Sequence, residues 1–186
     1  MTESDEVLMS AVRGGELDKL GLLFDRHSGA LFDFFVRMTS NRAVAEDLVQ
    51  EVFFRVLKYR KTYRDHGSFR TWMFHIARNA RADYFKKHRA EMPCSEEAFE
   101  IEDRAPFPVQ ELEQRQQEEL LRRAMLQLAE EKREVLVLAR YQEMKYDQIA
   151  RLLGCEVGAV KVRVHRALKE LRELYLKLSS EKQHAL

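Results

Sequence analysis

Hydrogen-bonding and basic side chains gather between residues 156 and 166, in a pattern that suits contact with a nucleic acid. Lys and Arg side chains bind phosphates and base edges, whereas a carboxylate repels phosphate unless it reads a cytosine amino group. The segment therefore predicts a DNA-contacting surface. Its candidate residues are Glu156, Lys161, Arg163 and Arg166.

The elements that must position these side chains are two helices with a tight turn, over residues 146–174. Apolar residues recur at helical spacing before Gly154, which can adopt the left-handed conformation that ends a helix. A short helix, a brief turn and a basic second helix place a helix in the major groove. An ordinary helical hairpin with a solvated basic face gives the same pattern, so the upstream sequence must decide. The apolar stripe of the second helix comprises Val160, Val164, Ala167, Leu168, Leu171 and Tyr175.

Composition favours an all-α protein. The 186 residues are 45% hydrophobic and 34% charged, with only 7 Gly and 3 Pro, so one or two small helical cores are expected. The N-terminus has neither a basic start nor an apolar run, which predicts no signal peptide and no membrane span. The two cysteines, Cys94 and Cys155, make no disulfide framework, and this usage predicts a cytoplasmic protein.

Charge is strongly segregated along the chain. Residues 1–90 hold 16 Lys or Arg against 12 acidic residues, residues 91–119 hold 2 against 10, and residues 120–186 hold 14 against 9. All three prolines lie in residues 93–108, a composition typical of a linker. Two basic lobes joined by an acidic linker indicate contact with a polyanion at two places. We therefore expect domains at 1–90 and 112–180, a linker at 91–111 and a tail at 181–186.

The N-terminal lobe reads as four helices. Asp5 is the expected cap of the first, which Gly14 and Gly15 end. The second spans residues 17–38, Asn41 caps the third at residues 43–60, and Ser68 caps the fourth at residues 69–89. The expected buried residues are Leu20, Phe24, Leu31, Phe34, Phe35 and Met38 in the second helix, Leu48, Val52, Phe53 and Val56 in the third, and Phe69, Trp72, Met73, Ile76, Ala77, Ala80 and Tyr84 in the fourth.

The order of these segments resembles an extracytoplasmic-function (ECF, group IV) RNA polymerase sigma factor, over about residues 7–178. The resemblance rests on LFDRHSGALFDFF, AEDLVQEVFFRVLKY and FRTWMFHIARNARADYFKKHR, followed by the acidic linker and the helix-turn-helix. It implies a promoter-specificity subunit that recruits polymerase core to −35/−10 promoters and helps to melt the DNA. It also implies that the β′ clamp helices, the β flap and an anti-sigma factor are protein partners.

The resemblance assigns roles to two further groups of residues. The third helix would bind the β′ clamp helices; here the alternative is that Phe54 is only the edge of the core. The fourth helix and the loop before it would read the −10 element, because aromatic rings stack on bases while basic side chains follow phosphates. The polymerase-binding candidates are Asp47, Gln50, Glu51, Phe54 and Arg55, and the −10 candidates are Ser68, Phe69, Arg78, Asn79, Arg81, Asp83 and Lys86.

The resemblance adds Gly158, Ala159 and Val162 to the −35 candidates. The recognition helix departs from the family pattern Gly-Thr-Val-basic-Ser-Arg, because Ala159 and Val162 replace the two hydroxyl residues. Lys145 also stands where Ser or Thr commonly caps the preceding helix. The −35 preference is therefore expected to differ from the common one. The alternative function is an autonomous helix-turn-helix regulator with an N-terminal dimerisation or sensing domain. An enzyme is not expected, since no Gly-rich phosphate loop, HExxH or CxxC is present, and no metal or other cofactor is predicted.

Overall fold

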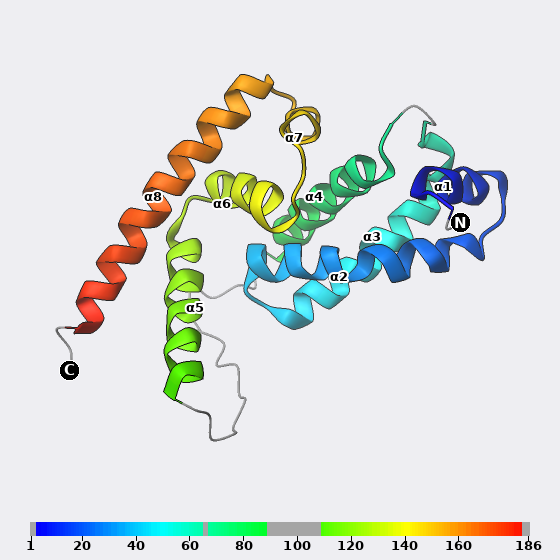
Figure 1. Cartoon of the computed structure of the whole chain (residues 1–186). Helices are drawn as coiled ribbons and strands as arrows, with labels where there is room; N and C mark the ends of the chain where they lie inside the picture. The colour runs from blue at the N-terminus through cyan, green and yellow to red at the C-terminus, as the bar shows by residue number, and fades with distance from the viewer. Residues whose placement is uncertain (1–2, 65–66, 89–108, 184–186) are drawn as a thin grey trace. The chain divides into compact units, whose positions relative to one another are not determined.

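The computed structural model describes residues 3–64, 67–88 and 109–183, and every regular element in these ranges is a helix (Figure 1). The expected all-α fold is confirmed. The elements are α1 Asp5–Gly14, α2 Lys19–Thr39, α3 Arg42–Tyr59, the 3₁₀ turn η1 Arg60–Thr62, α4 Phe69–His88, α5 Val109–Gln127, α6 Glu130–Leu136, the π-helical turn η2 Val137–Tyr141, α7 Tyr146–Leu153 and α8 Val157–Gln183.

The chain forms two compact units, one built on α1–α4 and the other on α5, α6, η2 and α8. The acidic linker expected at 91–111 lies outside the described residues up to Val109, where α5 begins. Cys94 and the three prolines lie there as well. At the other end, α8 continues to Gln183, into the segment expected to be a tail.

The N-terminal unit confirms most of the predicted helix ends and corrects one cap. Ser4, not Asp5, is the N-cap of α1, because its hydroxyl accepts a hydrogen bond from the Val7 amide at 3.4 Å. Asp5 is the first helical residue, and its side chain bonds to α2 instead. Gly15 ends α1 at φ 116°, a conformation that a side chain would strain. Asn41 caps α3 as predicted, accepting from the Val44 amide at 3.0 Å.

The buried face of α2 differs from the prediction in its first turns. Leu23 and His27 face the core, whereas Leu20 is half-buried and Phe24 remains 39% exposed. Phe24 lies at the margin of the core, with its ring 4.9 Å from that of Phe53. Four apolar residues within five positions allow more than one register, and the register that continues through Leu31 is the one that packs against α3.

The predicted cores of α3 and α4 are largely confirmed. All four candidates of α3 are buried, and in α4 the buried candidates are Phe69, Met73, Ile76, Ala77 and Ala80. Trp72 and Tyr84 are only half-buried, and Phe74 and Arg81 are buried in addition. The two helices pack along their lengths, so side chains on their outer faces are held at fixed spacing.

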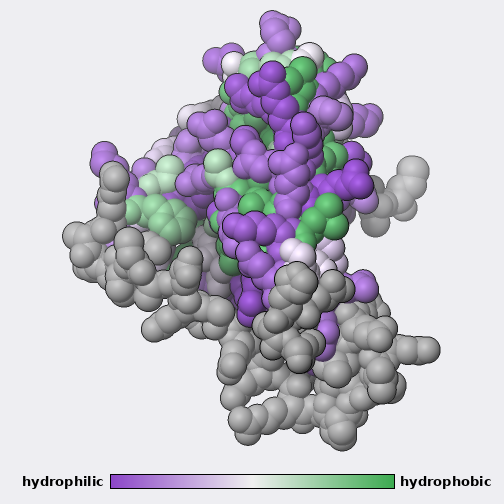
Figure 2. Space-filling view, turned by 90° about the vertical axis from the view of Figure 1, so that its left-hand side faces the viewer, coloured by the Kyte–Doolittle hydropathy of each residue, from purple (hydrophilic) through white to green (hydrophobic). Residues whose placement is uncertain are grey.

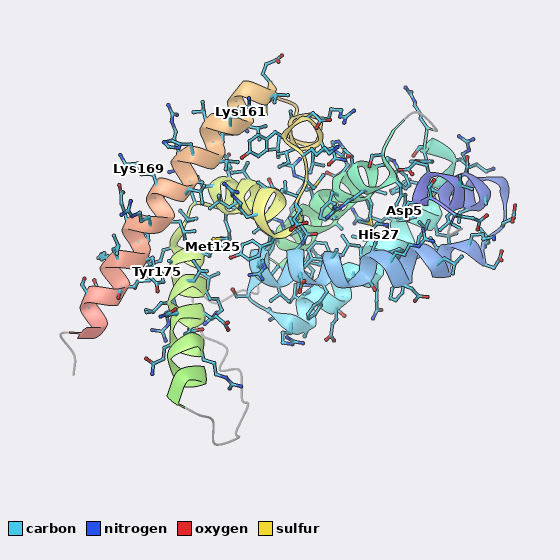
Figure 3. All side chains as sticks on the ribbon, viewed as in Figure 1. Asp5, His27, Met125, Lys161, Lys169 and Tyr175 are labelled. Carbon is cyan, nitrogen blue, oxygen red and sulfur yellow. The ribbon has the colours of Figure 1, made fainter. Side chains whose placement is uncertain are left out.

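In the C-terminal unit, α5 and α6 both pack against α8. Val160, Val164 and Ala167 are buried as predicted, whereas Leu168, Leu171 and Tyr175 are half-buried. Tyr175 lies on the side of α8 that faces α5, and Met125 belongs to α5 (Figure 3). Lys132 of α6 forms an ion pair with Glu170 of α8. These contacts fix the orientation of α8 within its unit and leave its N-terminal half free to present a polar face.

Candidate nucleic-acid and polymerase interfaces

One face of α3 is polar with an aromatic side chain at its centre. Asp47, Gln50 and Phe54 are exposed and Glu51 is half-buried, at spacings of three and four residues that place them along one side of the helix. Phe54 is 60% exposed, so it is not the edge of the core. An exposed aromatic surrounded by hydrogen-bonding groups is the composition of a protein-binding surface.

Arg55, the fifth polymerase candidate, joins α3 to α4. Its Nε donates to Oε1 of Glu51 at 2.6 Å, and its Nη1 donates to Oδ2 of Asp83 at 2.7 Å. Burial by itself lowers the pKa of Arg55, but the hydrogen bonds to the two carboxylates outweigh it, and the net pKa is raised. The guanidinium therefore stays charged and links the docking candidates of α3 to a −10 candidate of α4.

The exposed face of α4 presents Asn79, Asp83 and Lys86, four and three residues apart. His75 is exposed one turn before Asn79, as expected for a solvent-facing histidine. A groove beside this face, between α3 and α4, is lined by Arg55, Tyr59, Ile76, Asn79, Ala82 and Asp83. The sequence-based candidates did not include Tyr59, which is 43% exposed. Tyr59 lies three residues after the buried Val56, at the spacing of the apolar stripe, so the helical pattern of α3 gives no signal of its exposure.

Two of the predicted −10 residues are buried in this structure. Phe69 is fully buried, with its ring 5.3 Å from that of His27 and 6.3 Å from that of Tyr63, so it cannot stack on a base in this structure. Arg81 is only 6% exposed and cannot reach a phosphate. Phe69 instead packs among aromatic rings in the core of the unit, and Arg81 is buried in α4.

The two remaining −10 candidates lie near the surface of the unit. Ser68 is half-buried and its hydroxyl accepts from the Thr71 amide at 3.5 Å, in agreement with its predicted role as the cap of α4. Arg78 is half-buried.

The −35 candidates share the surface of the N-terminal half of α8. Glu156, Gly158, Lys161, Val162, Arg163 and Arg166 are exposed, and Ala159 is half-buried. Lys161 and Lys169, two turns apart, are both exposed (Figure 3). The described residues in the view of Figure 2 are mainly hydrophilic, with apolar patches among them. The helix thus presents a charged surface with two apolar members, Ala159 and Val162, where hydroxyls are usual in the family.

Gly154 and Gln148 shape the first helix of this hairpin. Gly154 has φ 63° and follows α7 directly, which confirms its predicted role in ending that helix. Lys145 offers no side-chain acceptor, and Oε1 of Gln148 accepts from the Lys145 amide at 3.0 Å, which is half of a capping box. The helix start is therefore stabilised although Ser and Thr are absent there.

Within the described residues, no helix combines the length and the apolar character needed to cross a membrane. The same residues contain no group of three or more His, Cys, Asp or Glu side chains placed to hold a metal ion. Cys155 is a half-buried free thiol.

Comparison with known families supports both units. Residues 23–91 match Sigma-70 region 2, and residues 118–171 match Sigma-70, region 4. The two matches define the class, an RNA polymerase sigma factor with a region 2 and a region 4. Individual relatives are also RNA polymerase sigma factors, and several belong to the ECF group. The chain is 31% identical to the RNA polymerase sigma factor CarQ of Myxococcus xanthus over 176 residues, covering 93% of this chain and 98% of that protein.

A second relative is the ECF RNA polymerase sigma factor SigM of Bacillus subtilis, at 28% identity over 82% of this chain and 93% of that protein. Among solved structures, the sigma factor RpoE of Bartonella quintana, in complex with the anti-sigma factor NepR, aligns with a TM-score of 0.64 at 27% identity, over 83% of this chain and 94% of that one. The fold is also shared with CnrH in complex with the cytosolic domain of CnrY, at a TM-score of 0.70 and 24% identity, over 92% and 97% of the two chains.

The chain belongs to the ECF sigma factors. It is accordingly a promoter-specificity subunit of bacterial RNA polymerase, with polymerase core and promoter DNA as its partners. Sigma factors are non-catalytic initiation factors. An autonomous helix-turn-helix regulator is not favoured, because the N-terminal unit matches Sigma-70 region 2.

Proposed function

We propose that three helical faces divide the work of this sigma factor. The observation that carries the proposal is the placement of an acidic face with a central Phe54 on α3, next to a separate polar face on α4 of the same unit. The first face suits a protein and the second suits a nucleic acid. The exposed basic face of α8 supplies the third contact.

The α3 face docks on the β′ clamp helices of the polymerase. Phe54 is its apolar anchor, and Asp47, Gln50 and Glu51 form the polar surround. Aromatic anchors within a polar rim carry a large share of the binding free energy of such interfaces. Arg55 contributes indirectly, by holding Glu51 in place.

The α4 face contacts the −10 element. The Asn79 amide can donate to and accept from a base edge, and Lys86 suits a phosphate. Tyr59 offers an exposed ring at the groove that Asn79 also lines, and base–aromatic stacking tolerates any base. Ser68 and Arg78, both half-buried, are further members of the proposed −10 contact.

The α8 face enters the major groove at the −35 element. Lys161, Arg163 and Arg166 bind phosphates or guanine edges, and the apolar Val162 side chain suits a thymine methyl group. Glu156 selects for a cytosine amino group. Because Ala159 and Val162 lack hydroxyls, the preferred −35 sequence differs from the common one of the family.

Further partners follow from the family and from the solved relatives. An anti-sigma factor holds this protein inactive, as NepR is bound to RpoE in the Bartonella quintana complex, and the β flap contacts the C-terminal unit. The protein works in the cytoplasm, without an enzymatic activity or a cofactor of its own.

Titration of polymerase core with the labelled sigma factor, followed by run-off transcription, tests the docking face. Phe54→Ala should weaken core binding by about 2 kcal/mol, which is ~30-fold. The free energy of unfolding should change by less than about 0.5 kcal/mol because the side chain is mostly exposed. Leu22→Ala, which truncates a 43% exposed side chain of α2, is the matched control and should leave core affinity unchanged. Equal core affinities for the two variants would disprove the docking assignment.

A further inference from the structure

Helix α1 contacts both ends of the segment that leads from α3 into α4. It precedes residues 23–91, the range that matches Sigma-70 region 2. The described residues of this connection are Tyr63, Arg64, Gly67 and Ser68, and it leads to the helix that carries Asn79.

The first contact fixes the start of the segment. Nη1 of Arg13 donates to the carbonyl oxygen of Tyr63 at 3.2 Å. The Tyr63 side chain is 2% exposed, and its hydroxyl donates to the carbonyl oxygen of Gly67 at 2.9 Å. Arg13 thus holds a residue that in turn holds the far end of the same segment.

The second contact fixes the start of α4. Oε1 of Glu6 accepts a hydrogen bond from the Phe69 amide at 3.4 Å. Phe69 is the first residue of α4, and the first amides of a helix have no partner within the helix. The Glu6 carboxylate also lies at the positive end of the helix dipole, which favours its charge. Glu6 and Ser68 therefore share the capping of α4.

The third contact joins α1 to α2, and through α2 it extends to the first residue of α4. Oδ2 of Asp5 lies 2.7 Å from Nε2 of His27, and Oδ1 of Asp5 accepts from Arg26 at 2.8 Å (Figure 3). The ring of His27 then packs at 5.3 Å from that of Phe69. Asp5 and His27 thus form a chain of contacts from α1 through α2 to the first residue of α4.

We propose that α1 is a positioning brace for −10 recognition, in which Arg13 holds Tyr63 and Glu6 holds the first residue of α4 in the positions that receive the separated DNA strand. The inference rests on the proposed −10 role of α4. Arg13 and Glu6 are positioning residues, since they act through the backbone at Tyr63 and Phe69 and need not touch DNA. Their loss should weaken −10 binding while polymerase docking and −35 binding are kept.

The test uses holoenzyme assembled with polymerase core, and a promoter that the parent holoenzyme selects from a randomised DNA library, prepared with its −10 region premelted. Arg13→Ala should lower affinity for this DNA about 3- to 10-fold, the range expected for one lost hydrogen bond. Arg42→Ala removes the same charge from an exposed residue at the start of α3 and should have no effect. Core affinity should remain at the parental value in both variants.

A local probe separates bracing from general stability. Trp72 is the only tryptophan, and its ring lies 5.2 Å from that of Tyr63. In the free protein, Arg13→Ala should make Trp72 fluorescence more accessible to acrylamide, whereas Arg42→Ala should not. If Arg13→Ala disturbs the fold, two Glu6 variants replace it in the test. Glu6→Gln keeps an acceptor oxygen and should bind the premelted DNA like the parent, whereas Glu6→Ala should bind it about 3-fold more weakly.

The outcomes distinguish the two proposals. If the parent holoenzyme does not bind the premelted −10 DNA more tightly than a scrambled sequence, the proposed function of α4 is wrong and the brace falls with it. If the parent binds but Arg13→Ala and Glu6→Ala bind equally well, only the brace is overturned. Weaker binding by both variants, with parental core affinity and altered Trp72 quenching, supports it.

Discussion

The ion pair between Arg55 and Asp83 decides whether Asp83 reads a base or supports the fold. Asp83→Ala removes a carboxylate that is 63% exposed and leaves Arg55, 19% exposed, with Glu51 as its remaining carboxylate partner among the described ion pairs. Exposed ion pairs contribute about 0.2–1 kcal/mol, and the lower exposure of Arg55 places this pair near the upper end, at ~1 kcal/mol. A loss of that size lowers the Tm of a 60–100-residue unit by about 4–8 °C.

A double-mutant cycle separates the two roles. Arg55→Ala, Asp83→Ala and the double variant are compared by denaturant unfolding, and we expect a coupling energy of about 0.5–1 kcal/mol between the two positions. The same variants are then assayed for open-complex formation on duplex and on premelted templates. Contacts to captured bases form only after melting, so a base-reading Asp83 gives a larger defect on the duplex, which the premelted template partly rescues.

The comparison with Arg55→Ala makes the result decisive. If Asp83 reads a base, Asp83→Ala must impair open-complex formation beyond the effect of Arg55→Ala, although both break the same ion pair. Equal defects of the two variants, on both templates, would refute the base-reading role and leave Asp83 as a support for α4. Asn79→Ala, which breaks no ion pair described for this protein, should show the duplex-selective defect in either case.

Three further predictions concern other parts of the molecule. Lys161→Ala and Arg163→Ala should each weaken −35 binding by about 1–3 kcal/mol where they read a base, and by less where they meet phosphate, with core affinity unchanged in filter-binding and pull-down assays; a matching loss of core affinity would contradict the assignment of α8. Burial raises the pKa of Asp5, but the bonds from Arg26 and His27 outweigh it, and the net pKa is lowered. The Asp5 carboxylate therefore stabilises the fold above the unfolded pKa near 3.8, and this contribution is lost as pH falls through the folded pKa. Unfolding measured at a series of acid pH values should show this loss, and the Asp5→Asn variant should not show it. Phe69→Ala should lower the free energy of unfolding by about 3–5 kcal/mol in denaturant titrations, as expected for a buried ring, and a loss below ~1 kcal/mol would mean that the ring is not part of the core.

The predictions from sequence were correct where the apolar residues define only one possible buried face of a helix. The stripe from Leu48 to Val56 and the residues Val160, Val164 and Ala167 each define one face of a helix, and the structure buries them. The predicted helix ends at Asn41 and Gly154 were correct, because the Asn side chain favours an N-cap and glycine readily adopts the positive φ that ends a helix. Such features depend on local sequence alone, so a single chain is sufficient to predict them.

The errors arose where tertiary packing chose between local alternatives. Ser4 and Asp5 are both good capping residues, and Asp5 was free to leave the cap because Arg26 and His27 on α2 offered it stronger partners. Arg81 was placed on the surface because of its charge, although Ala77 and Phe74, four and seven residues before it, belong to the buried face. The link from Arg55 to Asp83 joins residues 28 positions apart and leaves no mark in either helical pattern.

The shared guanidinium of Arg55 also constrains how such a protein can diverge. A lineage that exchanges Asp83 for another side chain, to acquire new target genes, leaves a partly buried cation on α3 with one fewer anion beside it. The simplest repair is a second substitution at position 51 or 55, and position 51 belongs to the surface that we propose docks on the polymerase. Arg55 therefore couples the position proposed to contact promoter DNA to the position proposed to contact the polymerase. A substitution at position 83 is expected to be accompanied by a substitution at position 51 or 55.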